Sequence, residues 1–404
     1  MSFTRALFVI SMILLQVGFS YYVSFQTIAL LIVFCLVIKY FKKLNFKTQD
    51  FLAFILFVVL AIITAIQAPN VVSPNSDNLF LTMFALVFYS GLIFFMPLLI
   101  FSNPLRIFLF FHKVSKWLII SLLGLLILSE SGIISTLNRQ AMRLQNANLI
   151  SNSSDLDSII ETMALNSTLD VSLRIDLFYG EPSFFILILF TSLSCFIITK
   201  KGIKKFQFLG SDKILIYEDR LLTILAIMAM LYVQSLSSVI YSAILIYFLF
   251  KGQLIKKKLL YKNITIIALL VFTFSYFIYD YLLSRLVEGS GLSFYQRFGW
   301  VVDLDIITIF TGLKNSNLLV DGGIHNGLIY ILLIAGIGGV FYIFRLLRNV
   351  YFRANKLEYG FLAVLVVLAI IMQNGAILSI NKIVISSLIL LPLACTENVL
   401  KKNK

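Results

Sequence analysis

Residues 182–199, PSFFILILFTSLSCFIIT, contain no charged side chain and are flanked by Glu181 on one side and Lys200 on the other. This length and composition match the roughly 17–25 apolar residues that cross the hydrocarbon core of a bilayer as one helix. Pro182 suits the first turn of that helix, where its missing N–H leaves no hydrogen bond unmade. The segment therefore predicts a membrane-spanning helix.

Similar apolar runs recur along the chain, of which 60% is hydrophobic and only 13% charged. These values exclude a soluble globular protein and predict an all-α, polytopic integral membrane protein forming a single domain over residues 1–404. Twelve spans are expected, at about 6–22, 25–41, 50–68, 79–100, 117–134, 182–199, 221–236, 238–250, 263–279, 326–344, 358–374 and 383–396.

The basic residues fix the predicted orientation, because cytoplasmic loops of membrane proteins are enriched in Lys and Arg. With both termini cytoplasmic, 26 of the 33 basic residues fall on the cytoplasmic side. Two large loops, at about 135–180 and 280–325, then lie outside the cytoplasm. Seven basic residues fall on the outer side: Arg139, Arg143, Arg174, Arg285, Arg297, Lys314 and Lys382.

Arginine predominates among the outer basic residues, whereas lysine predominates among the cytoplasmic ones. Charge alone would suffice for orientation, but the planar arginine fork binds phosphate oxygens through two hydrogen bonds. Arg139 and Arg143 are spaced i, i+4, so on a helix they would repel each other unless an anion lay between them. The outer arginines therefore predict a phosphate-bearing ligand; pairing with outer acidic side chains or lipid headgroups is the alternative.

Two polar segments directly precede predicted spans, and each has a catalytic and a structural interpretation. Glu181, with Arg174 and Asp176 shortly before it, can bind sugar hydroxyls or accept a proton, or it can complement the helix dipole. His325 can act as a general base or donate to a phosphate, or it can cap the helix together with Asn326.

Several other chemistries are unsupported by the sequence. No phosphate-binding Walker loop, HExxH, GxSxG or glycine-rich dinucleotide turn occurs, so neither nucleotide hydrolysis nor zinc or serine hydrolysis is predicted. The three cysteines lie far apart in apolar runs and match no metal or disulfide pattern. No role is assigned to His112, no cofactor is expected, and nucleic acid is not an expected partner.

Together these segments resemble the Wzy family, the polymerases of O-antigen and capsule repeat units in bacterial envelopes. The resemblance rests on twelve spans, two large periplasmic loops, "R-x5-G-E-P-S-F-F" from Arg174 and "H-N-G-L-I-Y-x4-A-G" from His325. O-antigen ligases share the second motif and the general plan, whereas the GEPSFF segment favours the polymerase. The arginine-to-glycine spacing described for some members is not cleanly present after Arg174 or Arg297.

The resemblance implies an enzyme of the bacterial inner membrane that joins oligosaccharide units carried on undecaprenyl diphosphate at the periplasmic face. It implies membrane lipids and a chain-length regulator protein as partners. His325, Glu181 and Asp176 are then the candidate bases. The expected ligands of the diphosphate are Arg174, Arg285, Arg297, Arg139, Arg143 and Asn326.

Two other functions remain open. An O-antigen ligase would use the same lipid-linked donor but transfer the glycan to lipid A-core. A flippase or transporter of lipid-linked oligosaccharides would also have about twelve spans, but its charges should line the membrane interior. The middle of almost every predicted span is uncharged, which disfavours transport.

Overall fold

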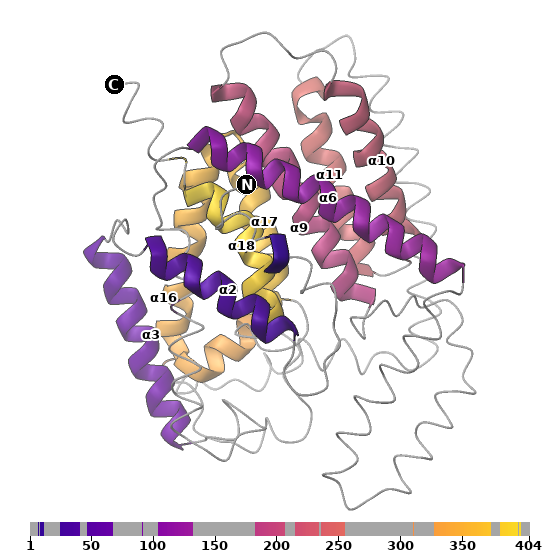
Figure 1. Ribbon diagram of the computed structural model, residues 1–404. Coiled ribbons are helices and arrows are strands. Elements are labelled where there is room, and N and C mark those ends of the chain that lie inside the picture. The colour runs from indigo at the N-terminus through magenta and orange to yellow at the C-terminus, as the bar shows by residue number, and fades with distance from the viewer. Residues whose placement is uncertain are drawn as a thin grey trace, which may run out of the picture.

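The computed structural model describes residues 25–40, 47–67, 104–131, 182–206, 215–233, 236–254, 327–372 and 380–394, and the isolated positions 7, 9–11, 91, 310 and 396. These residues form helices and no strands, which confirms the predicted all-α class for this part of the chain (Figure 1). The helices are α2 (Phe25–Tyr40), α3 (Thr48–Gln67), α6 (Pro104–Glu130), α9 (Pro182–Phe206), α10 (Leu215–Tyr232), α11 (Leu236–Leu254), α16 (Gly327–Asn355), α17 (Gly360–Met372) and α18 (Ile380–Ala394).

Nine of the twelve predicted spans coincide with these helices. The spans predicted at about 6–22, 79–100 and 263–279 lie largely or wholly outside the described residues. Helix α9 begins at Pro182, as predicted, and the expected break near residue 234 separates α10 from α11. Helix α6 begins well before the expected residue 117, and α16 continues well past the expected residue 344.

By length and composition, two helical segments of the described chain could cross a membrane: Arg106–Leu128 and Phe184–Lys205. Five further helical segments are apolar but shorter: Thr48–Thr64, Arg220–Tyr232, Ser237–Leu249, Gly360–Met372 and Lys382–Ala394.

Helices α9 and α18 form the centre of the bundle. Every residue from 185 to 199 and from 382 to 394 is buried. The two helices are in direct contact, because the Cys195 thiol in α9 donates a hydrogen bond to the Leu388 carbonyl in α18 at 3.0 Å. Such complete burial explains why neither segment shows an amphipathic pattern in the sequence.

Helix α6 packs along one side of α9. A side chain on Gly202 would clash with the Phe108 ring, 2.8 Å from its Cβ, so glycine permits this close approach. One helical turn further along α6, the His112 ring stacks on Phe196 with 4.3 Å between ring centroids. On another side of α9, Phe190 stacks on Tyr241 of α11.

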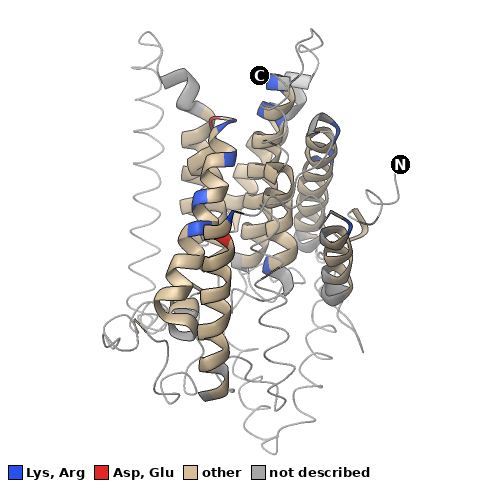
Figure 2. Cartoon of the chain, turned by 90° about the vertical axis from the view of Figure 1, so that its left-hand side faces the viewer, with Lys and Arg blue, Asp and Glu red and all other residues tan. Residues whose placement is uncertain are grey.

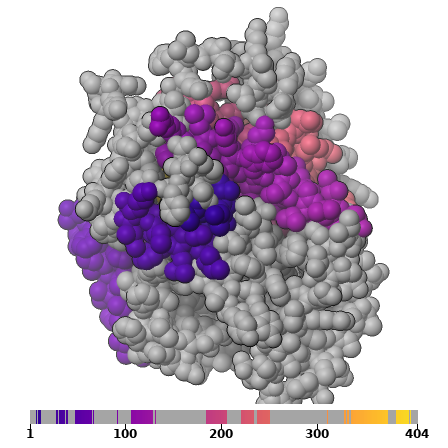
Figure 3. Space-filling model, in the orientation of Figure 1, coloured from indigo at the N-terminus to yellow at the C-terminus, as the bar shows by residue number. Residues whose placement is uncertain are grey.

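Helix α3 packs on α16 through a narrow stripe. Ala53, Phe57 and Ala61 are buried at intervals of four residues, and Phe57 stacks on Tyr342 with 4.5 Å between ring centroids. The small Ala side chains and Gly338 of α16 bring the two backbones close together. Helices α2, α3 and α6 are visible on the face of the molecule shown in Figure 3.

Contacts between helix ends show that several helices end at a common level. Lys201 near the end of α9 pairs with Glu358 just after α16, with 2.8 Å between nitrogen and oxygen. Arg353 near the end of α16 donates to the carbonyl of Ala394, the last residue of α18, at 3.2 Å. The C-terminal ends of α9, α16 and α18 therefore lie together, and the three helices run parallel.

We call this end of the bundle the basic end and the opposite end, where Pro182 and Gly327 begin α9 and α16, the entrance end. Helix α11 also ends at the basic end, because Phe248 packs near Tyr359. In Figure 2 most Lys and Arg positions of the described helices, coloured blue, lie in the upper part of the view. Those in the last turns of α9 and α16 and the following turn are Lys204, Lys205, Arg353 and Lys356.

Candidate functional site

All nine residues predicted for the site lie outside the described residues. The structure therefore neither brings them together nor separates them. They are the candidate bases His325, Glu181 and Asp176, and the candidate ligands Arg174, Arg285, Arg297, Arg139, Arg143 and Asn326. The two large loops predicted at 135–180 and 280–325 lie there as well, apart from the isolated position Phe310.

Two of these residues are nevertheless adjacent in sequence to described helices. Glu181 immediately precedes Pro182, the first residue of α9, and Asn326 immediately precedes Gly327, the first residue of α16. Because α9 and α16 run parallel from the entrance end, both helices begin at the same end of the bundle (Figure 1). The common direction of α9 and α16 thus brings the starts of the GEPSFF and HNG helices to the same end of the bundle.

Helix α16 is kinked close to its start. Gly336 has φ 48° and ψ −136°, a backbone conformation that only glycine adopts without strain. At Gly339 an added Cβ would lie 2.7 Å from the Ile331 carbonyl oxygen, so the turn before the kink folds tightly against the turn after it. These glycines let the first turns of α16 take a direction different from that of the rest of the helix.

Among the basic residues of the described helices, Lys382 is the one that lies toward the entrance end. It occupies the first turn of α18, and only 1% of its surface is exposed. Lys382 is one of the outer basic residues predicted from the sequence, where no function is assigned to it. A single charge at the start of an apolar run was the available signal, and burial is what distinguishes it from an ordinary flanking lysine.

A second pair of buried charges links α3 to α16. Arg345 donates from Nε to Asp50 Oδ1 at 2.7 Å, and its Nη2 forms an ion pair with the same oxygen. Arg345 also donates to Gln49 Oε1 at 3.2 Å. Asp50 lies in the first turn of α3, where a negative charge complements the helix dipole. The span predicted to end at residue 344 would leave Arg345 in the following cytoplasmic loop, whereas Arg345 lies within α16 and is buried.

His112 is half-buried between α6 and α9. Its ring stacks on Phe196, and its Nδ1 lies 3.4 Å from the Thr199 hydroxyl, which donates to the Cys195 carbonyl at 2.6 Å. These are packing contacts near the basic end, away from the starts of α9 and α16. They add no reason to give His112 a chemical role.

Metal-ligating groups are not clustered in the described part of the chain: no three His, Cys, Asp or Glu side chains there could hold one ion. Comparison with known proteins identifies no matching family model, no matching curated protein and no matching solved structure.

Proposed function

We propose that this chain is a polytopic membrane glycosyltransferase that polymerises lipid-linked oligosaccharide repeat units. The observation that carries this proposal is that α9 and α16 run in the same direction and begin at the same end of the bundle. The two helices that follow the candidate catalytic residues Glu181 and His325 therefore start at the same end of the bundle. The remaining support comes from the surface of the bundle, its charge and the sequence motifs.

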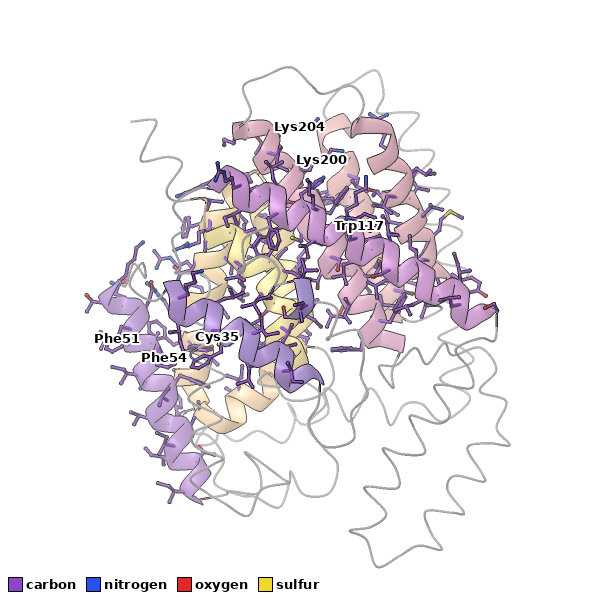
Figure 4. All side chains as sticks on the ribbon, in the orientation of Figure 1. Cys35, Phe51, Phe54, Trp117, Lys200 and Lys204 are labelled. Atoms are coloured by element: carbon purple, nitrogen blue, oxygen red, sulfur yellow. The ribbon has the colours of Figure 1, made fainter. Side chains whose placement is uncertain are left out.

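The distribution of apolar side chains supports placement in a membrane. Helix α3 exposes an apolar stripe opposite its contact with α16, and Trp117 of α6 is 69% exposed. Large outward-facing apolar areas are unusual on soluble monomers but are expected where helices contact lipid. Figure 4 labels three of the exposed side chains: Cys35 of α2, Phe51 of α3 and Trp117 of α6. The exposed side chains of the α3 stripe are Phe51, Leu52, Ile55, Leu56, Val59, Ile63 and Ile66.

Polar side chains, in contrast, are concentrated inside the bundle. Buried hydroxyls of α9 include Thr191, Ser192, Ser194 and Thr199. Ser192 donates to the Ile188 carbonyl at 2.7 Å, the way a hydroxyl satisfies its hydrogen bond within a helix. An apolar exterior around a partly polar interior fits a bundle solvated by lipid tails.

The charge distribution supports the orientation. Basic residues gather at the basic end, which we assign to the cytoplasm by the enrichment of Lys and Arg in cytoplasmic loops (Figure 2). The entrance end then faces the periplasm of a bacterial inner membrane. Lipid-linked repeat units are presented for polymerisation on that side.

The proposed reaction transfers a glycan between two lipid-linked units. A hydroxyl of the acceptor unit attacks the anomeric carbon of the donor chain and forms the new glycosidic bond. The bond from that carbon to the diphosphate oxygen breaks, and undecaprenyl diphosphate leaves with the bonding electrons. The acceptor proton passes to a base, for which His325, Glu181 and Asp176 are the candidates. Outer arginines stabilise the negative charge of the leaving diphosphate.

A gene deletion distinguishes this function from the two alternatives. A strain lacking the polymerase should carry single repeat units on lipid A-core, and the intact gene should restore the long-chain ladder on a gel. Absence of any units on core would identify a ligase instead. Accumulation of lipid-linked units on the cytoplasmic side of the membrane would identify a flippase.

A further inference from the structure

The buried charges of the described helices fall into two groups. Asp50, Arg345 and Arg353 lie in the half of the bundle toward the basic end, where Arg345 pairs with Asp50 and Arg353 donates to the Ala394 carbonyl. Lys382, equally buried, lies toward the entrance end on the central helix α18. Its position is therefore unlike that of the basic residues that set orientation.

The depth of Lys382 follows from the packing of α18 on α9. Leu388 of α18 is level with Cys195 of α9, and the helices run parallel. Lys382 lies six residues before Leu388, and Leu189 lies six residues before Cys195. Lys382 is therefore level with Leu189. Pro182, the first residue of α9, lies another seven residues toward the entrance end, or about 10 Å at a rise of about 1.5 Å per residue. The depth of Lys382, measured from the level of Pro182, is thus roughly one-third of the thickness of the hydrocarbon core of a bilayer.

A cationic side chain at this depth has a substantial desolvation cost, and ionisable residues inside membrane bundles commonly mark a binding site. An ammonium group has three N–H donors, so it can bind a ligand oxygen in addition to any contact within the chain. Lysine binds phosphate as a point charge, without the fixed fork of arginine. Its flexible stem also lets the ammonium extend toward the polar end of the helix.

We propose that Lys382 is a binding residue for the phosphate groups of the lipid-linked substrate. This inference rests on the proposed function and adds a cation from the last helix to the arginines expected in the loops. The ammonium would contact the inner phosphate of a polyprenyl diphosphate, whose isoprenoid tail enters the bilayer beside the bundle. It would hold the diphosphate at a fixed depth, with the glycan on the periplasmic side.

Thermal stabilisation of the purified full-length protein by defined lipids tests this assignment. The probes are undecaprenyl diphosphate, undecaprenol and phosphatidylglycerol, each added in detergent. Undecaprenyl diphosphate should raise the melting temperature of the wild type, whereas undecaprenol, which lacks phosphate, should not. Lys382→Met should bind undecaprenyl diphosphate about 10- to 100-fold more weakly, the effect of losing one charge-assisted hydrogen bond.

Two variants control for structural effects. Lys204→Met removes an exposed lysine at the basic end and should bind like the wild type. Lys382→Arg keeps the charge and should recover part of the affinity. If Lys382→Met does not accumulate in membranes, Lys382→Gln replaces it, since glutamine retains a polar side chain without the charge, and the same result is expected.

The outcomes separate the two proposals. If the wild type binds undecaprenyl diphosphate and the uncharged Lys382 variant binds it equally well, Lys382 is not a ligand, although the proposed function survives. If phosphatidylglycerol stabilises the wild type as strongly, and this effect also depends on Lys382, the site is a general phospholipid site and the substrate assignment is wrong. A wild type that does not respond to undecaprenyl diphosphate overturns both.

Discussion

Asp50 at the start of α3 and Arg345 in α16 form an ion pair that is almost completely buried, with 1% and 6% of their side-chain surfaces exposed. The two residues are separated by 295 positions in the chain. The pair joins an outer helix of the bundle to α16, the helix whose start follows His325. It therefore fixes α3 against α16 in the half of the bundle toward the basic end.

Removing one member of this pair should destabilise the protein strongly. Asp50→Asn leaves the Arg345 charge buried without its partner, a change that costs about 3–5 kcal/mol in buried pairs. The double variant Asp50→Leu/Arg345→Met removes both charges and should recover most of the stability. Thermal unfolding of detergent-purified protein measures both effects.

Lys201→Gln is the matched control, because its ion pair with Glu358 is exposed and such pairs contribute about 1 kcal/mol or less. An Asp50→Asn protein as stable as this control would show that the buried pair does not tie α3 to α16.

The glycines of α16 should tolerate no side chain. Gly336→Ala forces a residue with a Cβ into a conformation that costs about 1–3 kcal/mol, and Gly339→Ala clashes with the Ile331 backbone. Gly124→Ala in α6 is the control, since open space surrounds that position and alanine favours a helix by about 0.5–1 kcal/mol. Melting temperatures should fall for the first two variants and rise slightly for the control. Equal stability of all three would contradict the kink at Gly336.

The sequence predicts the helices well where their limits coincide with charge and proline. Helix α9 begins at Pro182 as expected, because proline is favoured in the first turn and Glu181 ends the uncharged run. Its other end was placed at residue 199, where the lysines begin, but the helix continues to Phe206. Hydropathy locates the end of an apolar segment, whereas a helix can continue into polar surroundings.

Arg345 shows a second limit. A basic residue after an apolar run predicts a loop outside the membrane, but α16 passes through Arg345 because Asp50 neutralises it from another helix. That partner is distant in sequence and cannot be identified from local patterns. The burial of Lys382 cannot be identified from local patterns either, because it results from the packing of α18 at the centre of the bundle. The predicted catalytic residues lie outside the described part of the chain, so their placement stays a prediction.

Reporter fusions test the proposed orientation. A reporter that works only in the periplasm should be active when it is fused at Ser154 or Asn317, in the two large loops. A reporter that works only in the cytoplasm should be active when it is fused at Lys204 or Lys257. Alkaline phosphatase and green fluorescent protein report the two compartments. A cytoplasmic signal at Ser154 or Asn317 would place the candidate site on the wrong side for a polymerase.

His325 separates a chemical role from a structural one. Loss of a general base or phosphate donor should lower polymer synthesis about 10²- to 10⁴-fold at unchanged protein level. Loss of a helix cap costs only about 1 kcal/mol of stability and little activity. We expect His325→Ala and His325→Gln both to be inactive, since glutamine cannot act as the base. Activity retained in the Gln variant alone would indicate phosphate binding, with Glu181 or Asp176 as the base.

Reconstitution measures the proposed reaction itself. Purified protein in liposomes would be supplied with undecaprenyl-diphosphate-linked repeat units and no nucleotide, and the glycans separated by size. The proposed function predicts a ladder whose members differ by one repeat unit, with one undecaprenyl diphosphate released for each unit added. No elongation by a correctly folded wild-type protein, or transfer only after lipid A-core is added, would contradict it.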